Sequence, residues 1–370
     1  MNTGLDTKQA IAMSMAVLLV ISAGLVVYVH PAFATKATKS DNKIVIMTQN
    51  LYQGVDLRPL ATTTTPTQFF TEVGLAYNRF LATDFSSRAE AIANEIKAAK
   101  PDIIGLQEAI IIRTQTPADG PATPATAVTA DFIEILLDKL EAKGLHYSLG
   151  PVQTGSDLEA PGLFPTGLMD VRLTDRDAIL IKDNLKGLFS TSNPQGGQYL
   201  ARSALPSPFG PLSTPRSWVS LDITFDDGRK ARIVSTHLEP LVPSVQVAQA
   251  AELIAGPGAT TLPLVLIGDF NSNADGSGTA TYGNLVNGGG LKDAWSILGV
   301  GNGFTCCQDA DLLNPASAFS RRIDLVLFQG TFKVQSIDVI GDSAEERTPS
   351  GLWPSDHGGV VAKLKLAPSK

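Results

Sequence analysis

The sequence predicts an α/β or α+β fold with mixed β-sheets, because short apolar strands outnumber helices and the helices are interspersed among them. The 370 residues are 44% hydrophobic, which is enough to bury a sizeable core in one large domain or two ordinary ones. We find no internal repeat. The composition therefore excludes a globally disordered chain.

Charge and cysteine content narrow the classes of partner and of fold. The net charge of −7 provides no general attraction to nucleic acid or to an anionic membrane, although a local basic cleft or bound divalent cations would create one. Cys306 and Cys307 are adjacent and cannot staple distant segments, so the fold does not depend on a disulfide framework. A vicinal disulfide, two buried thiols and an intermolecular bridge all remain open for this pair.

The N-terminal stretch has the pattern of a targeting segment. Residues 11–29 contain no charged residue, and Ala32-Phe33-Ala34 has the small-x-small pattern of a signal peptidase site. We therefore expect residues 1–34 to be a signal peptide cleaved near Ala34, with 35–42 as a polar linker. The alternative is an uncleaved membrane anchor through residues 11–29. Both readings predict that the remainder, residues 43–370, is exported as one domain.

Short apolar runs bounded by polar or turn residues predict the strands. Asp226-Asp227-Gly228 joins two of them into a hairpin. The predicted strands cover residues 43–49, 102–106, 178–181, 218–225, 231–236, 264–267, 323–328, 334–340 and 359–366.

Helical spacing of apolar residues predicts three helices, at residues 87–100, 131–143 and 245–254. Ser86 or Ser87 is expected to cap the first helix, and Pro101 to stop it. Stretches rich in Pro, Thr, Gly or Ser are interpreted as loops, and we expect these loops to set specificity. They cover residues 59–68, 113–129 and 188–215.

The segment Leu264 to Asn273 is the centre of the predicted site. A buried apolar strand leads into Gly268, which we expect to permit a tight turn, and then into Asp269 and Asn271. In extended backbone both side chains lie on one face. An ordinary Asx-rich turn is the alternative reading.

Other predicted strands also end in residues suited to a metal ion or a phosphate. Carboxylate oxygens suit a hard cation such as Mg²⁺, whereas no Cys/His cluster has zinc spacing. Strand ends are also where α/β folds build their sites. These residues are Asn50, Glu108, His237, Asp269, Asn271, Asp324, Asp356 and His357.

The segments that carry these residues resemble the endonuclease/exonuclease/phosphatase superfamily, which includes pancreatic-type deoxyribonucleases, neutral sphingomyelinases and inositol polyphosphate phosphatases. TQNLY, IIGLQEA, STHLEP, LIGDFNSN, RRIDLVL and SDHGGV occur in the family's order between Thr48 and Val360. The resemblance implies a four-layer αββα sandwich of two packed mixed sheets with outer helices. It also implies Mg²⁺-dependent hydrolysis of a phosphate ester, with Mn²⁺ or Ca²⁺ as substitutes.

The resemblance further implies roles for the residues. Glu108 matches the principal metal ligand, with Asn50 beside it and Asp356 at the metal or a second metal position. His237 and His357 would bracket the phosphate, Asp269 would orient or deprotonate the attacking water, and Asn271 would donate to a phosphate oxygen. Asp324 would hydrogen-bond His357 and fix its tautomer, although a plain ion pair with Arg321 or Arg322 is the alternative. Arg176 and Asp177 resemble a pair that some members place near the phosphate.

The predicted site residues indicate the reaction more closely than the substrate, because the same set of catalytic residues can act on esters with many different leaving groups. We expect a phosphate ester in a nucleic acid or a phospholipid headgroup, cleaved by a nuclease-like phosphodiesterase. Sphingomyelinase-like, phospholipase C-like or phosphatase activity is the alternative, and a catalytically silent binding module belongs to a different class. No predicted loop has a Lys/Arg-rich stripe interleaved with aromatic residues. No obligate protein partner is evident, so a monomer is expected.

Overall fold

The computed structural model describes residues 42–368. The predicted signal peptide or anchor at residues 1–34 lies outside the described residues, as does the predicted linker up to residue 41. Among the described residues, no helix combines the length and the apolar character needed to cross a bilayer.

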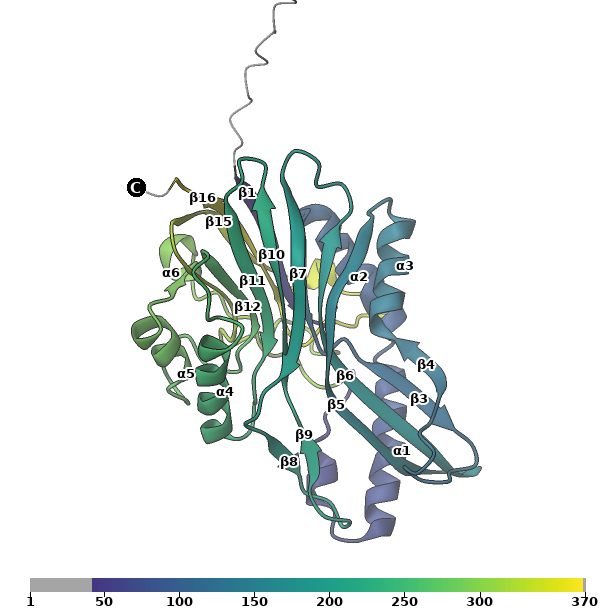
Figure 1. Ribbon diagram of the computed structural model, residues 1–370. Helices are drawn as coiled ribbons and strands as arrows, with labels where there is room; N and C mark the ends of the chain where they lie inside the picture. The colour runs from purple at the N-terminus through teal and green to yellow at the C-terminus, as the bar shows by residue number, and fades with distance from the viewer. Residues whose placement is uncertain (1–41, 369–370) are drawn as a thin grey trace, which may run out of the picture. The chain divides into compact units, whose positions relative to one another are not determined.

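Two large mixed sheets form the centre of the described part (Figure 1). The first sheet has the order β15-β16-β1-β2-β6-β3-β4, and β5 also pairs with β6. Within it β1 and β2 run parallel, whereas β16 is antiparallel to β1. The strands are β1 (Lys43–Asn50), β2 (Ile103–Gln107), β3 (Ile111–Gln115), β4 (Ala127–Asp131), β5 (Tyr147–Phe164), β6 (Gly167–Lys182), β15 (Phe332–Ile340) and β16 (Gly359–Leu366).

The second sheet has the order β13-β14-β12-β11-β10-β7, and a small two-stranded sheet, β8–β9, stands apart. Here β11 and β12 run parallel, whereas β14 is antiparallel to β12. The strands are β7 (Phe189–Gln198), β8 (Ser203–Leu205), β9 (Leu212–Thr214), β10 (Ser217–Phe225), β11 (Lys230–His237), β12 (Leu264–Asp269), β13 (Lys292–Asp293) and β14 (Asp324–Gln329).

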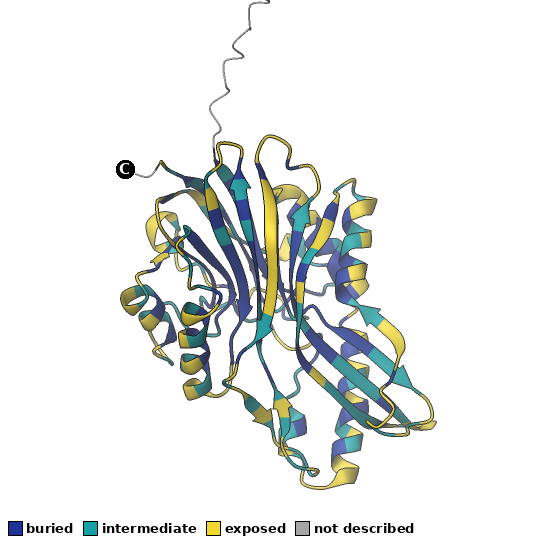
Figure 2. Cartoon of the chain, viewed as in Figure 1, coloured by how far each residue is buried: buried dark blue, intermediate teal, exposed yellow. Residues whose placement is uncertain are grey.

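Helices cover the outer faces of the two sheets, which pack on each other through a shared apolar core (Figure 2). Ile46 of β1 and Ile267 of β12 belong to that central core. A second cluster lies between the first sheet and its helices, and a third lies between the second sheet and α4. The predicted four-layer sandwich is therefore confirmed. The helices are η1 (Arg58–Thr62), α1 (Pro66–Ala82), α2 (Phe85–Ala99), α3 (Phe132–Ala142), α4 (Pro243–Ala255), α5 (Thr281–Gly283), η2 (Asn284–Gly288), α6 (Trp295–Leu298) and η3 (Ala344–Glu346).

The three predicted helices are present as α2, α3 and α4, with one capping residue predicted wrongly. Asp84, and not Ser86 or Ser87, is the N-cap of α2, because its side chain accepts from the Ser87 backbone N–H at 3.3 Å. The helix therefore begins two residues earlier than predicted. In α3 the Asp131 side chain accepts from the backbone N–H groups of Ile133 and Glu134.

The predicted loop at 59–68 is wrong at both ends, because the 3₁₀ helix η1 covers residues 58–62 and α1 begins at Pro66. Thr65 and Gln68 form a complete capping box, and Pro66 occupies the first turn, where its missing N–H costs nothing.

The predicted loop at 188–215 is wrong in three places, because β7 runs along β10 and the short strands β8 and β9 follow it. Glycine and proline weaken strands in isolation, but here the two glycines allow close approach. A Cβ on Gly197 would stand 2.8 Å from the Trp218 ring, and one on Gly196 would stand 3.0 Å from the Gln153 side chain. The residues that suggested a loop are thus the ones that tight packing on β10 and β5 requires.

Candidate active site

The predicted site residues meet at one end of the sandwich because of the sheet topology. The carboxyl ends of the parallel pairs β1–β2 and β11–β12 place Asn50, Glu108, His237 and Asp269 at the same edge. The antiparallel strand β14 begins there too, with Asp324 paired in register with Asp269. A cleft of about 510 Å³ opens at this edge, and its lining includes Glu108, Asn271 and Asp356.

One oxygen of Asp269 is the hub of the cluster. Asp269 Oδ2 accepts hydrogen bonds from Asn50 Nδ2 at 3.2 Å and from Asn271 Nδ2 at 3.3 Å. His237 Nε2 lies 3.4 Å from the same oxygen and His357 Nε2 lies 3.9 Å from it. Burial and the neighbouring Asp324 raise the pKa of Asp269 to about 7. A carboxyl group poised near neutrality is suited to accept a proton.

The backbone after β12 is a turn, as the alternative reading of this segment predicted. Asn271 has φ +50°, and its N–H donates to Asp269 Oδ1 at 2.8 Å, as in an Asx turn. The expected common face of extended backbone is therefore absent, and the turn itself brings the amide to the carboxylate. Gly268 lies within the strand, where a Cβ would come within 1.9 Å of the Thr236 carbonyl oxygen. Close approach of β11, and not a turn, requires this glycine.

His357 and Asp324 form the predicted pair. His357 Nδ1 lies 2.8 Å from Asp324 Oδ2, which leaves Nε2 facing the cluster. Burial opposes the charged imidazolium, but the carboxylates of Asp324, Asp356 and Asp269 together raise the pKa of His357 well above its usual value. The alternative ion pair of Asp324 with a neighbouring arginine is not formed. Arg322 instead pairs with Asp293 at 2.8 Å.

Cys306 and Cys307 are joined as a vicinal disulfide, one of the three open alternatives. Cys307 lines the cleft, and its sulfur lies 3.9 Å from His357 Nε2. Arg321 Nη2 donates to both sulfurs, at 3.1 and 3.2 Å. Cys307 therefore forms part of the cleft wall beside His357, whereas Cys306 is buried behind it.

His237 is held by a cation that sequence analysis did not single out. Arg216 Nη1 lies 3.1 Å from Nδ1 and 3.3 Å from Nε2 of the ring, and 3.6 Å from Asp175. Burial, Arg216 and His357 lower the pKa of His237 well below its usual value. The two histidines thus favour opposite protonation states, neutral for His237 and charged for His357.

The sequence signal for Arg216 and Asp175 was weak. Arg216 follows Pro215 at the end of a predicted loop, and Asp175 lies one residue before the Arg176-Asp177 pair. The structure places the Arg176 side chain on the Ala109 carbonyl oxygen, at 2.7 Å, and on Asp131. Asp177 accepts from Ser217 behind the cleft wall. Asp175 and Arg216 line the cleft, and Arg176 and Asp177 are absent from its lining.

The half-buried carboxyl groups of Glu108 and Asp356, which both line the cleft, fit a hard divalent cation. Burial and Asp175 raise the pKa of Glu108, whose Oε2 accepts from Gln53 N–H at 2.6 Å. Burial raises the pKa of Asp356 to about 7 against the charge of His357, and Glu108 adds to the rise. Asp356 Oδ1 is buried without a hydrogen-bond partner. Oxygen donors with an orphaned carboxylate oxygen are what Mg²⁺ or a similar ion would satisfy.

Two other groupings of ligand-type side chains fit a metal less well. Asp269, Asp324 and His357 lie close enough to share an ion, but the hydrogen bond between Asp324 and His357 already uses one atom of each. The disulfide removes the thiolates that Cys306 and Cys307 would offer. The Asn50 amide is oriented by Tyr52 N–H, which donates to Oδ1 at 2.9 Å, and by Asp269.

A buried arginine fixes the segments that carry the site. Arg88 of α2 is 0% exposed and donates to the carbonyl oxygens of Leu51, Tyr52, Thr83 and Pro354. These contacts tie the exit of β1, which bears Asn50, to the segment that leads to Asp356. An arginine on a helix normally indicates a solvated face, so the sequence offered no signal for this role.

Comparison with known proteins identifies the family of the chain. The sequence pattern of the Endonuclease/Exonuclease/phosphatase family matches residues 47–357, and the chain belongs to this family. The chain is therefore a phosphoesterase of that superfamily, whose members hydrolyse phosphoester bonds and generally use divalent metals. No curated protein matches the chain in sequence.

Solved structures of the same family share the fold. A family protein from Bacteroides vulgatus is 15% identical with a TM-score of 0.55, covering 88% of this chain and 99% of that chain. One from Bacteroides thetaiotaomicron is 19% identical with a TM-score of 0.52, covering 88% and 95%. A mannosyl-6-phosphatase from B. thetaiotaomicron is 18% identical with a TM-score of 0.50, covering 88% and 100%. At these identities the similarity concerns the fold alone.

Proposed function

We propose that this chain is an exported, Mg²⁺-dependent phosphodiesterase that hydrolyses a phosphate ester by in-line attack of water. The observation that carries the proposal is the convergence of Asn50, His237, Asn271 and His357 on a single oxygen of Asp269. A water held at that oxygen would be oriented by four side chains and would face a buried carboxyl group able to take its proton.

The two histidines and the asparagine would share the charge of the phosphoryl group. His357, kept charged by Asp324, would place its Nε2 proton against a phosphoryl oxygen. Asn271 Nδ2 donates to the Leu238 carbonyl oxygen and, at a longer distance, to Asp269, and it would exchange the longer bond for one to another phosphoryl oxygen as negative charge builds. His237 is neutral, so it would act as a hydrogen-bond partner held in place by Arg216.

Glu108 and Asp356 would hold the divalent cation, with Asn50 beside them. When bound, such a cation polarises a phosphoryl oxygen and neutralises developing charge. Without the cation the two carboxyl groups repel each other, which is the source of part of the rise in the Asp356 pKa.

The test is turnover of bis-p-nitrophenyl phosphate by the purified full chain with Mg²⁺, with and without EDTA. We expect EDTA-sensitive release of p-nitrophenol in wild type and its loss in His237→Ala, with both proteins folded by circular dichroism. Metal-independent turnover, or full activity in His237→Ala, would refute the assigned site.

Substrate class and export need their own measurements. Plasmid DNA, RNA and sphingomyelin liposomes compared side by side would separate a nuclease from a phospholipid-cleaving enzyme. The cleft contains Arg58, Arg216 and Arg321 but more acidic side chains than basic ones, which favours a small ester over a duplex. Mass spectrometry of the protein from its native host would distinguish cleavage near Ala34 from a retained anchor.

A further inference from the structure

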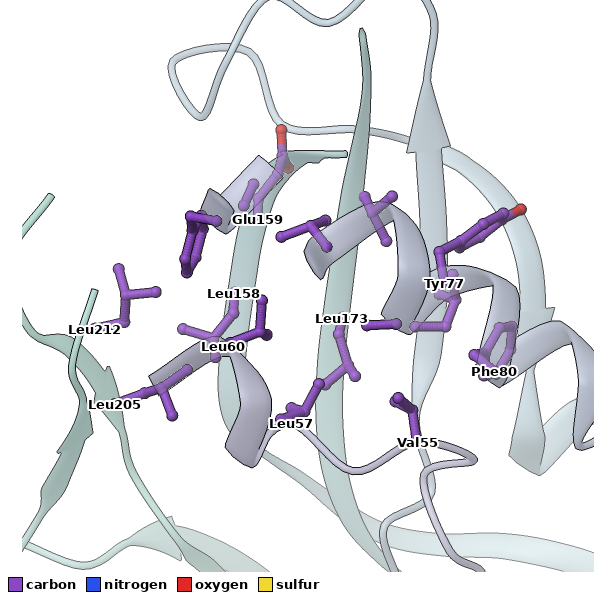
Figure 3. A pocket seen from close by; sticks show the side chains of 16 residues that line it. Val55, Leu57, Leu60, Tyr77, Phe80, Leu158, Glu159, Leu173, Leu205 and Leu212 are labelled. Atoms are coloured by element: carbon purple, nitrogen blue, oxygen red, sulfur yellow. The ribbon is translucent and has the colours of Figure 1, made fainter. Parts of the chain in front are cut away.

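An apolar pocket of about 70 Å³ lies directly beside the cleft (Figure 3). Its lining is apolar except for the Glu159 carboxylate and the Tyr77 hydroxyl, which Figure 3 shows at the edge of the group. Nothing in the proposed chemistry uses this pocket. An apolar void costs stability, so its position beside the catalytic cleft calls for an explanation.

The pocket and the cleft share a wall. Val55, Leu57, Leu158, Leu173 and Leu205 line both of them. The two regions are therefore continuous through these five apolar side chains.

Two strands lead from the cleft into the pocket along one face of the first sheet. Residues two apart on a strand share a face, and each such step advances about 7 Å. Leu158 pairs in register with Leu173, and Ala160 pairs with Val171. From the cleft into the pocket, the residues are Ser156, Leu158 and Ala160 on β5, and Asp175, Leu173 and Val171 on β6.

Helix α1 lines much of the rest of the pocket, and the β8–β9 hairpin forms a further wall that contacts both the pocket and the cleft. Leu205 and Leu212, which pair in register, line the pocket. At the tip, Phe209 stacks on Phe70 with ring centroids 5.6 Å apart and meets Phe69 edge-on at 5.9 Å. At its other end Ser203 donates to Glu239, a cleft residue. The hairpin therefore spans from the polar site to α1.

We propose that the pocket is a subsite for a short alkyl group of the substrate, whose phosphate lies in the cleft; this rests on the proposed function. A volume of about 70 Å³ is roughly half that of an engineered cavity, of about 150 Å³, that binds benzene. The pocket thus suits a group of a few carbons and is too small for a long acyl chain. A water molecule in the pocket would form few hydrogen bonds, because the lining offers few polar partners.

The first test varies one arm of the substrate and keeps the leaving group constant. Methyl, butyl and hexyl p-nitrophenyl phosphate are compared with the purified full chain and Mg²⁺. We expect kcat/KM to rise about fourfold for each buried methylene from methyl to butyl, and to level off at hexyl when the pocket is full. Equal kcat/KM for methyl and butyl esters would overturn the proposal.

Two variants address the pocket itself. Ala160→Phe places a ring in the pocket, and the butyl-to-methyl ratio of kcat/KM should fall to about one. Leu212→Ala enlarges the pocket, and the hexyl-to-butyl ratio should rise. Ala127→Phe on the exposed face of β4 is the matched control and should keep the wild-type ratios. Thermal unfolding checks that each variant is folded.

A binding measurement separates failure of this subsite from failure of the proposed function. Methylphosphonate and butylphosphonate, which are not hydrolysed, are titrated by calorimetry. Tighter binding of butylphosphonate to wild type but not to Ala160→Phe, with no turnover of any ester, would support the subsite and refute the enzyme. Turnover of the esters together with equal binding of both phosphonates would support the enzyme and refute the subsite.

Discussion

The cleft and the apolar pocket are built on the same two strands, but the cleft buries charged side chains and the pocket buries apolar ones. At the cleft end of β5 and β6, Asp175 and its neighbours bury carboxyl groups whose pKa values are raised by burial. One step of two residues further along each strand, Leu158 and Leu173 begin an apolar surface. Burying charge destabilises the fold, whereas burying leucine stabilises it. Changes in the cleft should therefore affect turnover more than stability. Changes at the pocket should affect stability, and the preference among alkyl esters, more than turnover of a methyl ester.

The largest expected effect tests the cleft side of this contrast. Asp269→Asn removes the proposed base and should lower kcat by about 10³-fold, within the usual range for general-base catalysis. Its melting temperature should stay the same or rise, because a buried carboxyl with a raised pKa is removed. Retained activity within tenfold of wild type, or a clear loss of stability, would break the contrast.

Arg216 sharpens the contrast because it touches a catalytic histidine. Arg216→Met should lower kcat/KM by about 100-fold, the size typical of losing one donor to the transition state. Arg216→Lys should recover part of the loss, since a cation remains near His237 and Asp175. Equal rates for the two variants would show that the charge has no role.

Metal binding offers a test that does not use activity. If Mg²⁺ binds only the folded chain, a concentration of about 100 times Kd stabilises it by about 2.7 kcal/mol. We expect a rise in melting temperature with Mg²⁺, its reversal by EDTA, and its absence in Glu108→Gln. The same shift in Glu108→Gln would place the ion elsewhere.

Glu95, which lies outside both the cleft and the pocket, shows how burial of a carboxyl group makes stability depend on pH. Glu95 of α2 is fully buried, with Oε1 unpartnered, and burial raises its pKa well above normal, helped by Glu346 and Asp342. The folded state then holds a proton that the unfolded state loses, so stability falls as pH rises above the unfolded pKa of about 4.3. Glu95→Gln should be about 1–3 kcal/mol more stable than wild type at pH 8, within the cost of an unsatisfied buried group.

That advantage of Glu95→Gln should vanish near pH 4, where the carboxyl is protonated in both states. Chemical denaturation at the two pH values measures it. An advantage that does not change with pH would mean that charge is not the cause.

The smallest effect tests the pocket side. Phe209→Ala removes the ring contacts that hold the hairpin on α1 and should cost about 1 kcal/mol of stability. Turnover of methyl p-nitrophenyl phosphate should change by less than about threefold. Urea denaturation of the same samples measures the loss of stability. A large loss of turnover without a loss of stability would show that the hairpin takes part in chemistry.

Local patterns predicted much of the fold and of the site. The hairpin of β10 and β11, the helices α3 and α4, and the strand β16 follow from alternation, helical spacing and turn residues. The site residues at the ends of β1, β2, β11 and β12 were visible as polar residues after apolar runs. The capping box of α1 was also present in the sequence, but the Thr/Pro-rich composition before it was interpreted as loop.

The sequence by itself determined which side chains are available and which strand ends carry them, because burial patterns and caps are local. Only the tertiary structure decided that Arg216 holds His237, that Arg88 ties two distant segments together, and that a polar cleft continues into an apolar pocket. Those contacts join residues far apart in the chain, and their energies depend on burial, which no short window of sequence contains.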